Sequence, residues 1–356
     1  MKQLDLPAVA LIFGGRGFEH DVSVESAKFV LPLIPTDKYT PIPILISESG
    51  EWLTTDPTSD DTRLTARLSL RVFPFPKGKN DSHGNLITER GDLIRVDAAI
   101  PLLHGDHGED GEIQGVLCAA GIPFVGCSTV AGAVSADKEY TKLVAESIGI
   151  TTARGITFSA ARARLDTNAV LSECETALGY PLFVKPTTLG SSIGASEAFD
   201  RGALVTAIEN AVMTGVDRIL VEKYVRKTRE LECAYLSIPG SDPILSIGEI
   251  RCEGSYDYTK KYLSGDACVL DCAGISDSTD RLIRSSVLRL AEALGIRDLC
   301  RFDFFECEDG SIIFNEVNTM PGFTRSSLYP ALIKKCGMDN RMLIDALIRA
   351  SLTRGA

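Results

Sequence analysis

The chain has 356 residues, a formal net charge of −11 at pH 7 and a hydrophobic share of 44%. This length predicts about two or three globular domains, and the ordinary charged share of 24% argues against a disordered chain. The acidic balance disfavours a broad nucleic-acid or membrane-surface footprint, and no apolar run approaches the ~18 residues of a membrane span.

The ten cysteines are scattered singly, and none forms a C-x-x-C pair of the kind that holds zinc. Four histidines are too few to complete zinc sites with them. Several cysteines lie in apolar runs, such as Leu117-Cys118-Ala119, where a thiol is usually a small buried hydrophobe. The pattern predicts reduced thiols and a cytosolic protein.

The first region has the alternation of strands and helices that is typical of an α/β domain. An apolar run at residues 9–13 predicts a buried strand, and residues 22–34 have helical apolar spacing. The glycines between them lack the G-x-G-x-x-G spacing of a dinucleotide site. Glu19 would lie at the carboxyl end of the strand, where it suits an ammonium group; the alternative is a helix-dipole charge.

A second unit repeats this plan, with a strand at 96–103, a polar loop at 104–111, a helix at 112–120 and a short strand at 124–125. Residues 52–83, rich in Pro, Asp and Arg, predict an irregular insertion. The 104–111 loop resembles a metal or catalytic cluster, or else a turn before an acidic helix start. We expect a structured loop that lines a site, with His104 facing the substrate.

The rest of the chain predicts mixed sheets with helices between the strands. Helices are expected at 136–148, 169–178, 281–294, 327–335 and 341–352. Strands are expected at 155–158, 180–184, 219–224, 231–237 and 243–250, followed by a hairpin. The fold class is therefore a three-part α/β and α+β protein.

Lys185 ends an apolar strand and precedes a loop of glycines and hydroxyl residues at 187–194. Such a loop can direct backbone N–H groups at an anion, while the lysine supplies a point charge. The Walker A order of residues is absent, so this pattern taken alone favours an ordinary flexible connection.

The expected hairpin joins strands at 299–306 and 312–317 through Asp309-Gly310, a sequence typical of a two-residue type I′ turn. With that turn, Asp303 lies opposite Glu316 and Arg301 lies opposite Asn318, all on one face. Opposed carboxylates repel unless a cation lies between them. Their oxygens suit Mg²⁺, and the alternative is a solvated acidic face.

Taken together and in this order, the motifs resemble the D-alanine–D-alanine ligase family. The resemblance spans nearly the whole chain and rests on Gly14-Gly15 with Glu19, His104-Gly105, Gly108-Glu109-Asp110-Gly111, Gln114-Gly115, Asp137-Lys138, Lys185, Gly190-Ser191-Ser192, and Glu316 and Asn318 with Pro321-Gly322. It implies the ATP-grasp fold. The expected domains are 1–126, 127–221 and 222–356, with a lid loop at 254–268.

The resemblance implies ATP and Mg²⁺ as cofactors, with Mn²⁺ or a monovalent cation as further candidates. Mg²⁺ would be bound by Asp303, Glu316 and Asn318, in agreement with the hairpin register. The nucleotide would be contacted by Lys138, Lys185, Ser192, Glu222, Lys223, Val225, Glu230 and, from the lid, Lys261. The basic stretch 226–229 before Glu230 departs from the short turn usual in the family.

For the amino acids, the resemblance implies that Glu19 binds the ammonium group of the first D-alanine, helped by Ser191 and Tyr262. Arg301 and the backbone N–H of Gly322 would form the oxyanion hole. Ser327 would anchor the second carboxylate, with His104 and Leu328 nearby. The implied reaction makes a D-alanyl phosphate from ATP, which the amine of the second D-alanine then attacks.

The second substrate is expected to be D-alanine. Lactate-using relatives have a histidine where Tyr262 stands, and D-serine-using relatives commonly carry an arginine or another polar residue where Leu328 stands. A buried hydroxyl without a partner costs about 1–3 kcal/mol, or roughly tenfold discrimination. The alternative is a D-alanine–D-serine ligase of the vancomycin-resistance type.

Outside enzymes, a nucleotide-binding regulator that kept the fold would be expected to have lost ligands, whereas here every metal and phosphate position is filled. We expect small-molecule D-amino acids and ATP as partners, with neither nucleic acid nor a membrane. Family members are usually homodimers, and an apolar helix surface at 24–34 could supply the contact.

Overall fold

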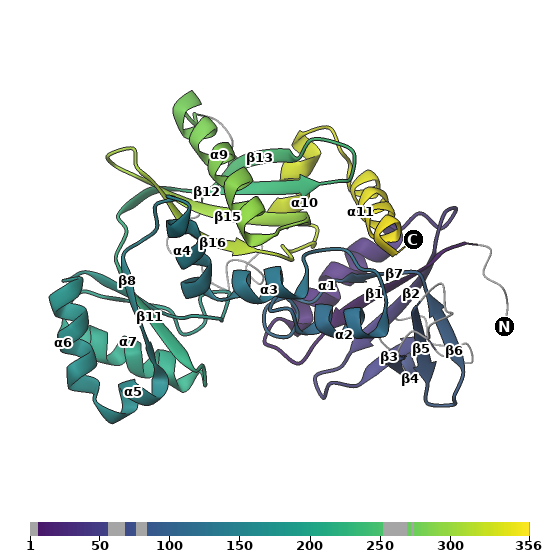
Figure 1. Cartoon of the computed structure of the whole chain (residues 1–356), viewed down its shortest axis with the longest axis horizontal. Coiled ribbons are helices and arrows are strands. Elements are labelled where there is room, and N and C mark those ends of the chain that lie inside the picture. Colours follow the sequence, from purple (N-terminus) through teal and green to yellow (C-terminus); the bar gives the residue numbers. More distant parts are fainter. Residues whose placement is uncertain (1–5, 56–67, 76–83, 252–268, 272–273, 356) are drawn as a thin grey trace.

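The computed structural model describes residues 6–55, 68–75, 84–251, 269–271 and 274–355. These residues form three sheets, each covered by helices (Figure 1). No helix among them is long and apolar enough to cross a membrane. The expected lid at 254–268, with Lys261 and Tyr262, lies outside the described residues.

The first sheet has seven strands in the order β6-β5-β4-β3-β2-β1-β7. All seven residues of β1 (Ala8–Gly14) are buried, because β1 lies between the parallel neighbours β2 (Thr40–Ile46) and β7 (Ala98–Pro101) and has packed layers on both faces. The antiparallel strands of this sheet are β3 (Trp52–Thr55), β4 (Leu68–Phe75), β5 (Gly84–Thr88) and β6 (Leu93–Val96).

The expectation of an irregular insertion over residues 52–83 was wrong for β3 and β4. In β4, Val72 is fully buried whereas Arg71 and Phe73 are exposed. This alternation is typical of a strand with one face exposed to solvent. Arg71 pairs with Glu51 on that face, at 2.7 Å. Polar residues on a half-exposed strand made the segment resemble a loop. The strand expected at 124–125 is a single bridge between Phe124 and Ala99.

Helices cover both faces of this sheet. α2 (Glu112–Ala120) packs Ile113 and Leu117 against one face, and α1 (His20–Val30) covers the other, followed by the 3₁₀ turn η1 (Leu31–Leu33). Cys118 is exposed, so the expectation of a buried thiol was wrong there; its neighbour Leu117 is the buried residue.

The apolar face of α1 is covered by its own chain. Val24, Ala27 and Val30 pack in one core with residues of α10 (Leu328–Lys335) and α11 (Asn340–Gly355). These side chains are therefore not available to a second copy, and the expected dimer contact at 24–34 was wrong for them. Homodimer formation itself remains a prediction.

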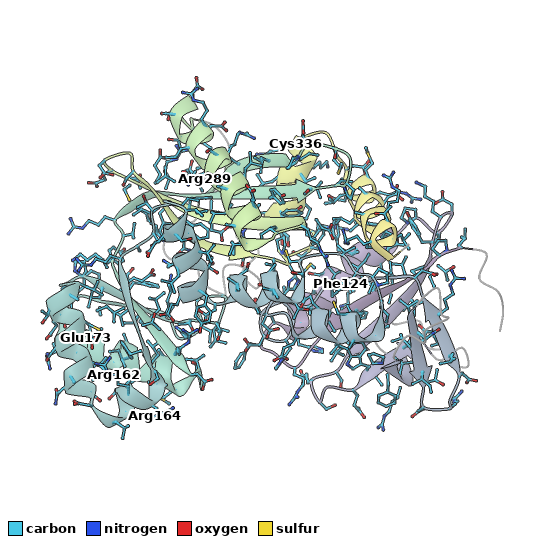
Figure 2. All side chains as sticks on the ribbon, viewed as in Figure 1. Phe124, Arg162, Arg164, Glu173, Arg289 and Cys336 are labelled. Atoms are coloured by element: carbon cyan, nitrogen blue, oxygen red, sulfur yellow. The ribbon has the colours of Figure 1, made fainter. Side chains whose placement is uncertain are left out.

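The second sheet has four antiparallel strands in the order β10-β9-β11-β8, and its core is formed by residues between 156 and 221 alone. Figure 2 labels Arg162, Arg164 and Glu173 on this unit, where Arg162 and Glu173 form an exposed ion pair. The elements are β8 (Gly155–Ser159), α5 (Ala160–Leu165), α6 (Thr167–Ala177), β9 (Leu182–Pro186), β10 (Ser196–Ala198), α7 (Arg201–Met213) and β11 (Arg218–Lys223).

The third sheet has the order β14-β13-β12-β15-β16 and is antiparallel throughout. Its strands are β12 (Lys227–Ser237), β13 (Ile244–Arg251), β14 (Val269–Asp271), β15 (Asp298–Cys307) and β16 (Ile312–Asn318). One face packs against α3 (Thr129–Ala136), α4 (Lys138–Ser147) and α9 (Asp277–Leu294), and α10 covers the other. Residues 127–150 thus share a core with this sheet; the expected domain boundaries remain predictions.

Candidate active site

The β15–β16 hairpin has the predicted register at its functional end. Asp303 pairs with Glu316, and Arg301 pairs with Asn318. The predicted turn was wrong, because the loop has three residues, 308–310, and only Gly310 has a positive φ, at 78°. The N–H of Gly310 donates to the carbonyl of Cys307 at 2.9 Å, as in a type I turn followed by a left-handed glycine.

A β-bulge compensates for the longer turn. The register shifts between Asp303 and Phe304, which leaves Asn315 as an extra residue on β16. Phe314 and Val317 point into the core, so the consecutive residues Asn315 and Glu316 both line the pocket on the opposite face. The bulge therefore adds a polar side chain to the site.

The donor set on this hairpin fits a hard divalent cation, because Asp303, Glu316 and Asn318 all offer side-chain oxygens on one face. Cationic side chains already surround the two carboxylates. Arg301 donates to both oxygens of Asp303 at 2.8 Å, and the Lys138 ammonium lies 3.9 Å from Glu316. Such opposed carboxylates need positive charge between them, which a bound ion would complete.

A large pocket lies between the second and third sheets. Every residue expected from the described part of the chain to contact nucleotide lines it: Lys138, Lys185, Ser192, Glu222, Lys223, Val225 and Glu230. We call it the nucleotide pocket. Among these residues, Glu230 pairs with Lys227 at 2.6 Å, and Lys223 donates to the carbonyls of Gly179 and Tyr180.

The lysines of this pocket are held by buried partners. The Lys185 ammonium lies 2.7 Å from Glu222 and 3.4 Å from the side-chain oxygen of Asn315. Lys138 begins α4 and donates to the carbonyl of Leu189 at 2.7 Å. Burial lowers the pKa of Lys138, even though Glu316 opposes the shift.

Lys142, which sequence reasoning missed, is also buried and forms an ion pair with Glu222. Burial lowers its pKa to about 8, with Lys185 adding to the shift. Burial alone would raise the pKa of Glu222, but Lys185 and Lys142 together keep it below its ordinary value. Nothing in the local sequence marks Lys142, since a lysine inside a helix usually faces solvent.

The loop after β9 has a strained backbone. Ser191 and Ser192 both have left-handed φ angles, 51° and 60°, which cost energy for residues other than glycine. Backbone N–H donation from Lys138 to the carbonyl of Thr187, at 2.9 Å, ties the loop to α4. Successive N–H groups in such turns form anion-binding concavities.

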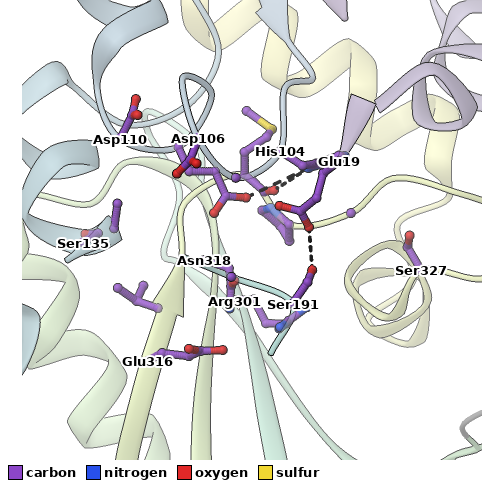
Figure 3. A pocket seen from close by; sticks show the side chains of 18 of the residues that line it. Glu19, His104, Asp106, Asp110, Ser135, Ser191, Arg301, Glu316, Asn318 and Ser327 are labelled. Atoms are coloured by element: carbon purple, nitrogen blue, oxygen red, sulfur yellow. Dashed lines mark hydrogen bonds and ion pairs between the residues drawn. The ribbon is translucent and has the colours of Figure 1, made fainter. Parts of the chain in front are cut away.

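A second pocket, the amino-acid pocket, lies beside the first and is shown in Figure 3. Glu19 precedes α1 and is largely buried; it accepts a hydrogen bond from the hydroxyl of Ser191 at 2.6 Å. Gly105 permits this arrangement, because a Cβ atom there would lie 2.2 Å from the second Glu19 oxygen. A carboxylate held this way suits an ammonium ligand.

His104 also lines this pocket, but both of its ring nitrogens are engaged by the protein. Nδ1 lies 3.1 Å from the carbonyl oxygen of Met320 and therefore donates to it, while Nε2 accepts from the hydroxyl of Ser26 at 3.1 Å. Burial lowers the pKa of His104 and so favours the neutral ring. Its ring is positioned as part of the wall.

Glu109 lines the same pocket, and we had assigned it no role from the sequence. Burial raises its pKa well above the ordinary value; the charges of Glu19 and Glu316 add to this, and Arg301 opposes it. The signal was present, since Glu109 lies in the loop expected to line a site. Its position adds a further carboxyl group to the wall of this pocket.

The far wall of the amino-acid pocket comes from the start of α10. Ser327 occupies the N-cap position of this helix without a side-chain capping bond, and its hydroxyl instead accepts from the N–H of Thr324, before the helix, at 2.8 Å. Gly322 passes close by, since a Cβ atom there would lie 2.9 Å from the Ser327 oxygen. Leu328 places an apolar side chain in the wall, only 9% exposed.

The two pockets meet at residues that line both of them. These residues are Lys138, Gly190, Ser191, Arg301 and Glu316. The two pockets thus share one boundary, with Arg301 and one candidate metal ligand, Glu316, on it. Of the other two ligands, Asp303 lines the nucleotide pocket and Asn318 the amino-acid pocket. This arrangement can bring an amino acid and a polyphosphate into contact.

Comparison with known proteins identifies the family. Residues 8–127 match the family model described as D-ala D-ala ligase N-terminus, and residues 144–349 match D-ala D-ala ligase C-terminus. The chain belongs to the D-alanine–D-alanine ligase family. Curated relatives named D-alanine–D-alanine ligase include the protein from Chlorobium chlorochromatii, which is 37% identical over 97% of each chain. The protein of that name from Treponema pallidum is 36% identical over 98% of this chain and 89% of the relative.

Solved structures of similar proteins agree with this family assignment. The VanG D-Ala:D-Ser ligase from Enterococcus faecalis is 33% identical, with a TM-score of 0.82 over 98% of this chain and 100% of that one. The D-alanine-D-alanine ligase from Coxiella burnetii is 27% identical, with a TM-score of 0.82 over 99% and 95%. The expected ATP-grasp fold and family are confirmed.

Proposed function

We propose that this enzyme joins two D-alanine molecules into D-alanyl-D-alanine, converting ATP to ADP and phosphate, as a step toward peptidoglycan precursors in the cytosol. The observation that carries the proposal is the shared boundary of the two pockets, where Arg301 and Glu316 line both. One pocket holds the Glu19 carboxylate, which suits an ammonium group, and the other holds Lys138 and Lys185, which suit a polyphosphate.

The chemistry requires activation before the peptide bond can form. A carboxylate does not react with an amine, because its oxygen is a poor leaving group. Transfer of the terminal phosphoryl group of ATP to the first D-alanine gives an acyl phosphate and ADP. The amine of the second D-alanine then attacks the carbonyl carbon and releases phosphate, while Arg301 and the N–H of Gly322 stabilise the tetrahedral oxyanion.

The other assigned residues position the phosphates and the two amino acids for this reaction. In this scheme Lys138 and Lys185 bind the phosphates, and Glu19 with Ser191 binds the ammonium group of the first D-alanine. Ser327 anchors the second carboxylate. Lys261 and Tyr262 complete the scheme as predictions, since they lie outside the described residues.

Asp303, Glu316 and Asn318 would hold Mg²⁺, which neutralises phosphate charge when bound. Mn²⁺ would be accepted by the same oxygen donors, and a monovalent cation is a further candidate. Arg301 binds Asp303 through two hydrogen bonds, so it competes with the ion for that carboxylate.

For the second substrate we propose D-alanine, because the nearly buried side chain of Leu328 gives the wall an apolar surface suited to a methyl group. A D-alanine–D-serine ligase is the alternative, favoured by the similarity to a structure named as a D-Ala:D-Ser ligase.

The test uses purified protein with ATP and Mg²⁺. Phosphate release should depend on D-alanine, and mass spectrometry should detect the dipeptide. Equal D-alanine and D-serine in competition should yield mainly D-alanyl-D-alanine. Release that is independent of D-alanine would contradict the proposed function, whereas a predominance of D-alanyl-D-serine would contradict only the choice of second substrate.

A further inference from the structure

A single buried carboxylate, that of Glu222, holds two lysines. One of its oxygens pairs with Lys142, and the other lies 2.7 Å from Lys185. All three residues are at most 7% exposed. Glu222 and Lys185 line the nucleotide pocket, whereas Lys142 is not among the described residues that line it. Lys142 therefore lies behind the carboxylate, away from the expected phosphates.

We propose that Lys142 is a positioning residue for nucleotide binding. It stays with Glu222 as a permanent counter-ion, so that Lys185 can leave Glu222 and bind a phosphate of the nucleotide. The proposal rests on the proposed function, because it takes the nucleotide pocket to be the ATP site.

The reason is the cost of a buried charge. Without Lys142, the movement of Lys185 toward phosphate would leave the Glu222 carboxylate buried without a cation, next to further negative charge. Lys185 would then be held back by Glu222, and nucleotide affinity would fall. With Lys142 in place, Glu222 keeps one ion pair throughout, and only one lysine has to move.

The placement of Lys142 on α4 supports this role. Lys138 and Lys142 are four residues apart on the helix, so their side chains project from the same face. The Lys138 side chain lines both pockets, whereas the Lys142 side chain turns to Glu222 on β11. Ion pairs from Arg218 to Asp137 and Glu139 fix the first turn of α4 against β11.

A double-mutant cycle tests the inference through binding of MgADP, measured by calorimetry without turnover. K142M should raise the Kd for MgADP about tenfold, since one charge is removed from a buried group close to the phosphates. In the E222Q background the same substitution should change Kd less than about twofold, because no carboxylate remains to restrain Lys185.

Several variants serve as controls. K142R keeps the charge and should restore most of the affinity, whereas K142Q keeps a hydrogen-bond donor without charge and should weaken binding nearly as much as K142M. K28M removes an exposed lysine that pairs with Glu25 on α1 and should leave Kd unchanged. Thermal melts establish that each variant is folded; if K142M does not fold, K142Q takes its place in the cycle.

Three outcomes would overturn the positioning role of Lys142 or the proposed function. Equal weakening in the wild-type and E222Q backgrounds would mean that Lys142 acts on the nucleotide directly, and would overturn the positioning role. An unchanged Kd in both K142M and K142Q would overturn it as well. Failure of the wild-type chain to bind MgADP would overturn the proposed function itself, and the inference with it.

Discussion

The two pockets differ in the buried ionisable groups that line them, although they share one boundary. The amino-acid pocket is lined by carboxylates, and burial raises the pKa of Glu109 there. The nucleotide pocket is lined by lysines as well as carboxylates, and burial lowers the pKa of Lys138, which lines both pockets. In each case the fold keeps a group whose charge is disfavoured by its surroundings.

The difference shows how each pocket is matched to its ligand. A carboxylate whose pKa is raised gains most from an ammonium ligand, and a lysine whose pKa is lowered gains most from a phosphate. Burial of these groups lowers the stability of the fold, and binding of the proposed ligands would offset that loss. Substitutions that neutralise one pocket should therefore affect one substrate, whereas those at the boundary should affect both.

The largest effect is expected at the boundary. E316Q should lower activity by about a thousandfold or more, because it removes a candidate metal ligand that lines both pockets. Phosphate release and Mn²⁺ binding measured by electron paramagnetic resonance with ADP would check it. E308Q, on the exposed turn of the same hairpin, serves as the control. An E316Q enzyme that remains active and saturates with Mg²⁺ would refute the metal assignment.

In the amino-acid pocket, E19Q should lower kcat/KM for D-alanine by roughly ten- to a hundredfold, since a charged hydrogen bond contributes about 1.5–3 kcal/mol. MgADP affinity should remain close to that of the wild type, which separates the two pockets. E25Q on the exposed side of α1 is the matched control. Equal losses for both ligands would show that the pockets are not electrostatically distinct.

G105A should lower D-alanine affinity by about tenfold, less than E19Q, because the carboxylate stays but must move. The added Cβ would lie 2.2 Å from the Glu19 oxygen, and φ at this position is +64°. G91A controls for backbone strain, since its φ is +85° with no atom within 4 Å of the added Cβ. If G91A weakens D-alanine binding equally, the contact with Glu19 is not the cause.

The smallest effect concerns pH and Lys142. Its folded pKa of about 8 lies below the ordinary 10.5, mainly through burial and Lys185, while Glu222 and Glu316 oppose the shift. As pH rises through about 8, Lys142 loses its proton and MgADP affinity should fall a few-fold. Between pH 8 and 10.5 the unfolded chain binds the extra proton, so folding stability should rise instead.

These opposite slopes are measured as differences between the wild type and K142R, whose guanidinium keeps its charge over this range. Calorimetric titrations give the affinity, and thermal melts give the stability. If K142R shows the same fall in MgADP affinity near pH 8, another group is responsible for it.

The register of the candidate metal hairpin was predicted correctly because two errors cancelled. Asp309-Gly310 indicated a two-residue turn, but the loop has three residues, and the bulge at Asn315 shifts the register back. That bulge is held by tertiary structure, because the N–H of Phe314 donates to the carbonyl of Thr151 at 2.9 Å. The local sequence does not predict a contact between residues that lie so far apart in the chain.

Dependence on tertiary contacts also explains the other features that sequence reasoning missed. The buried strand at 8–14 was predictable because both of its faces are apolar, whereas the half-exposed β3 and β4 resembled a loop. The ion pair of Lys142 with Glu222 joins positions 80 apart in sequence, so no spacing rule indicates it. Periodicity indicated that α1 has an apolar face, but not that α10 and α11 cover it.

The unit from β8 to β11 enters and leaves through neighbouring strands. β8 and β11 pair antiparallel, and the N–H of Lys223 donates to the carbonyl of Arg154 at 2.8 Å, where the unit begins and ends. Its core is its own, and Figure 1 shows it set apart from the other two sheets. A tilt of this unit about its two-stranded connection would break the ion pairs that join Arg218 and Glu222 on β11 to α4, so these pairs oppose it.

That tilt would act on both ligands together. Ser191 belongs to this unit, whereas Glu19 precedes α1 on the first sheet, so a tilt that opened the nucleotide pocket would also break their hydrogen bond. In the proposed scheme, the nucleotide and the amino acid would therefore both favour the arrangement in which this bond is made. By thermodynamic reciprocity, the factor by which the nucleotide raises the affinity for D-alanine equals the factor by which D-alanine raises the affinity for the nucleotide. Loss of the Ser191–Glu19 hydrogen bond should therefore lower both factors equally.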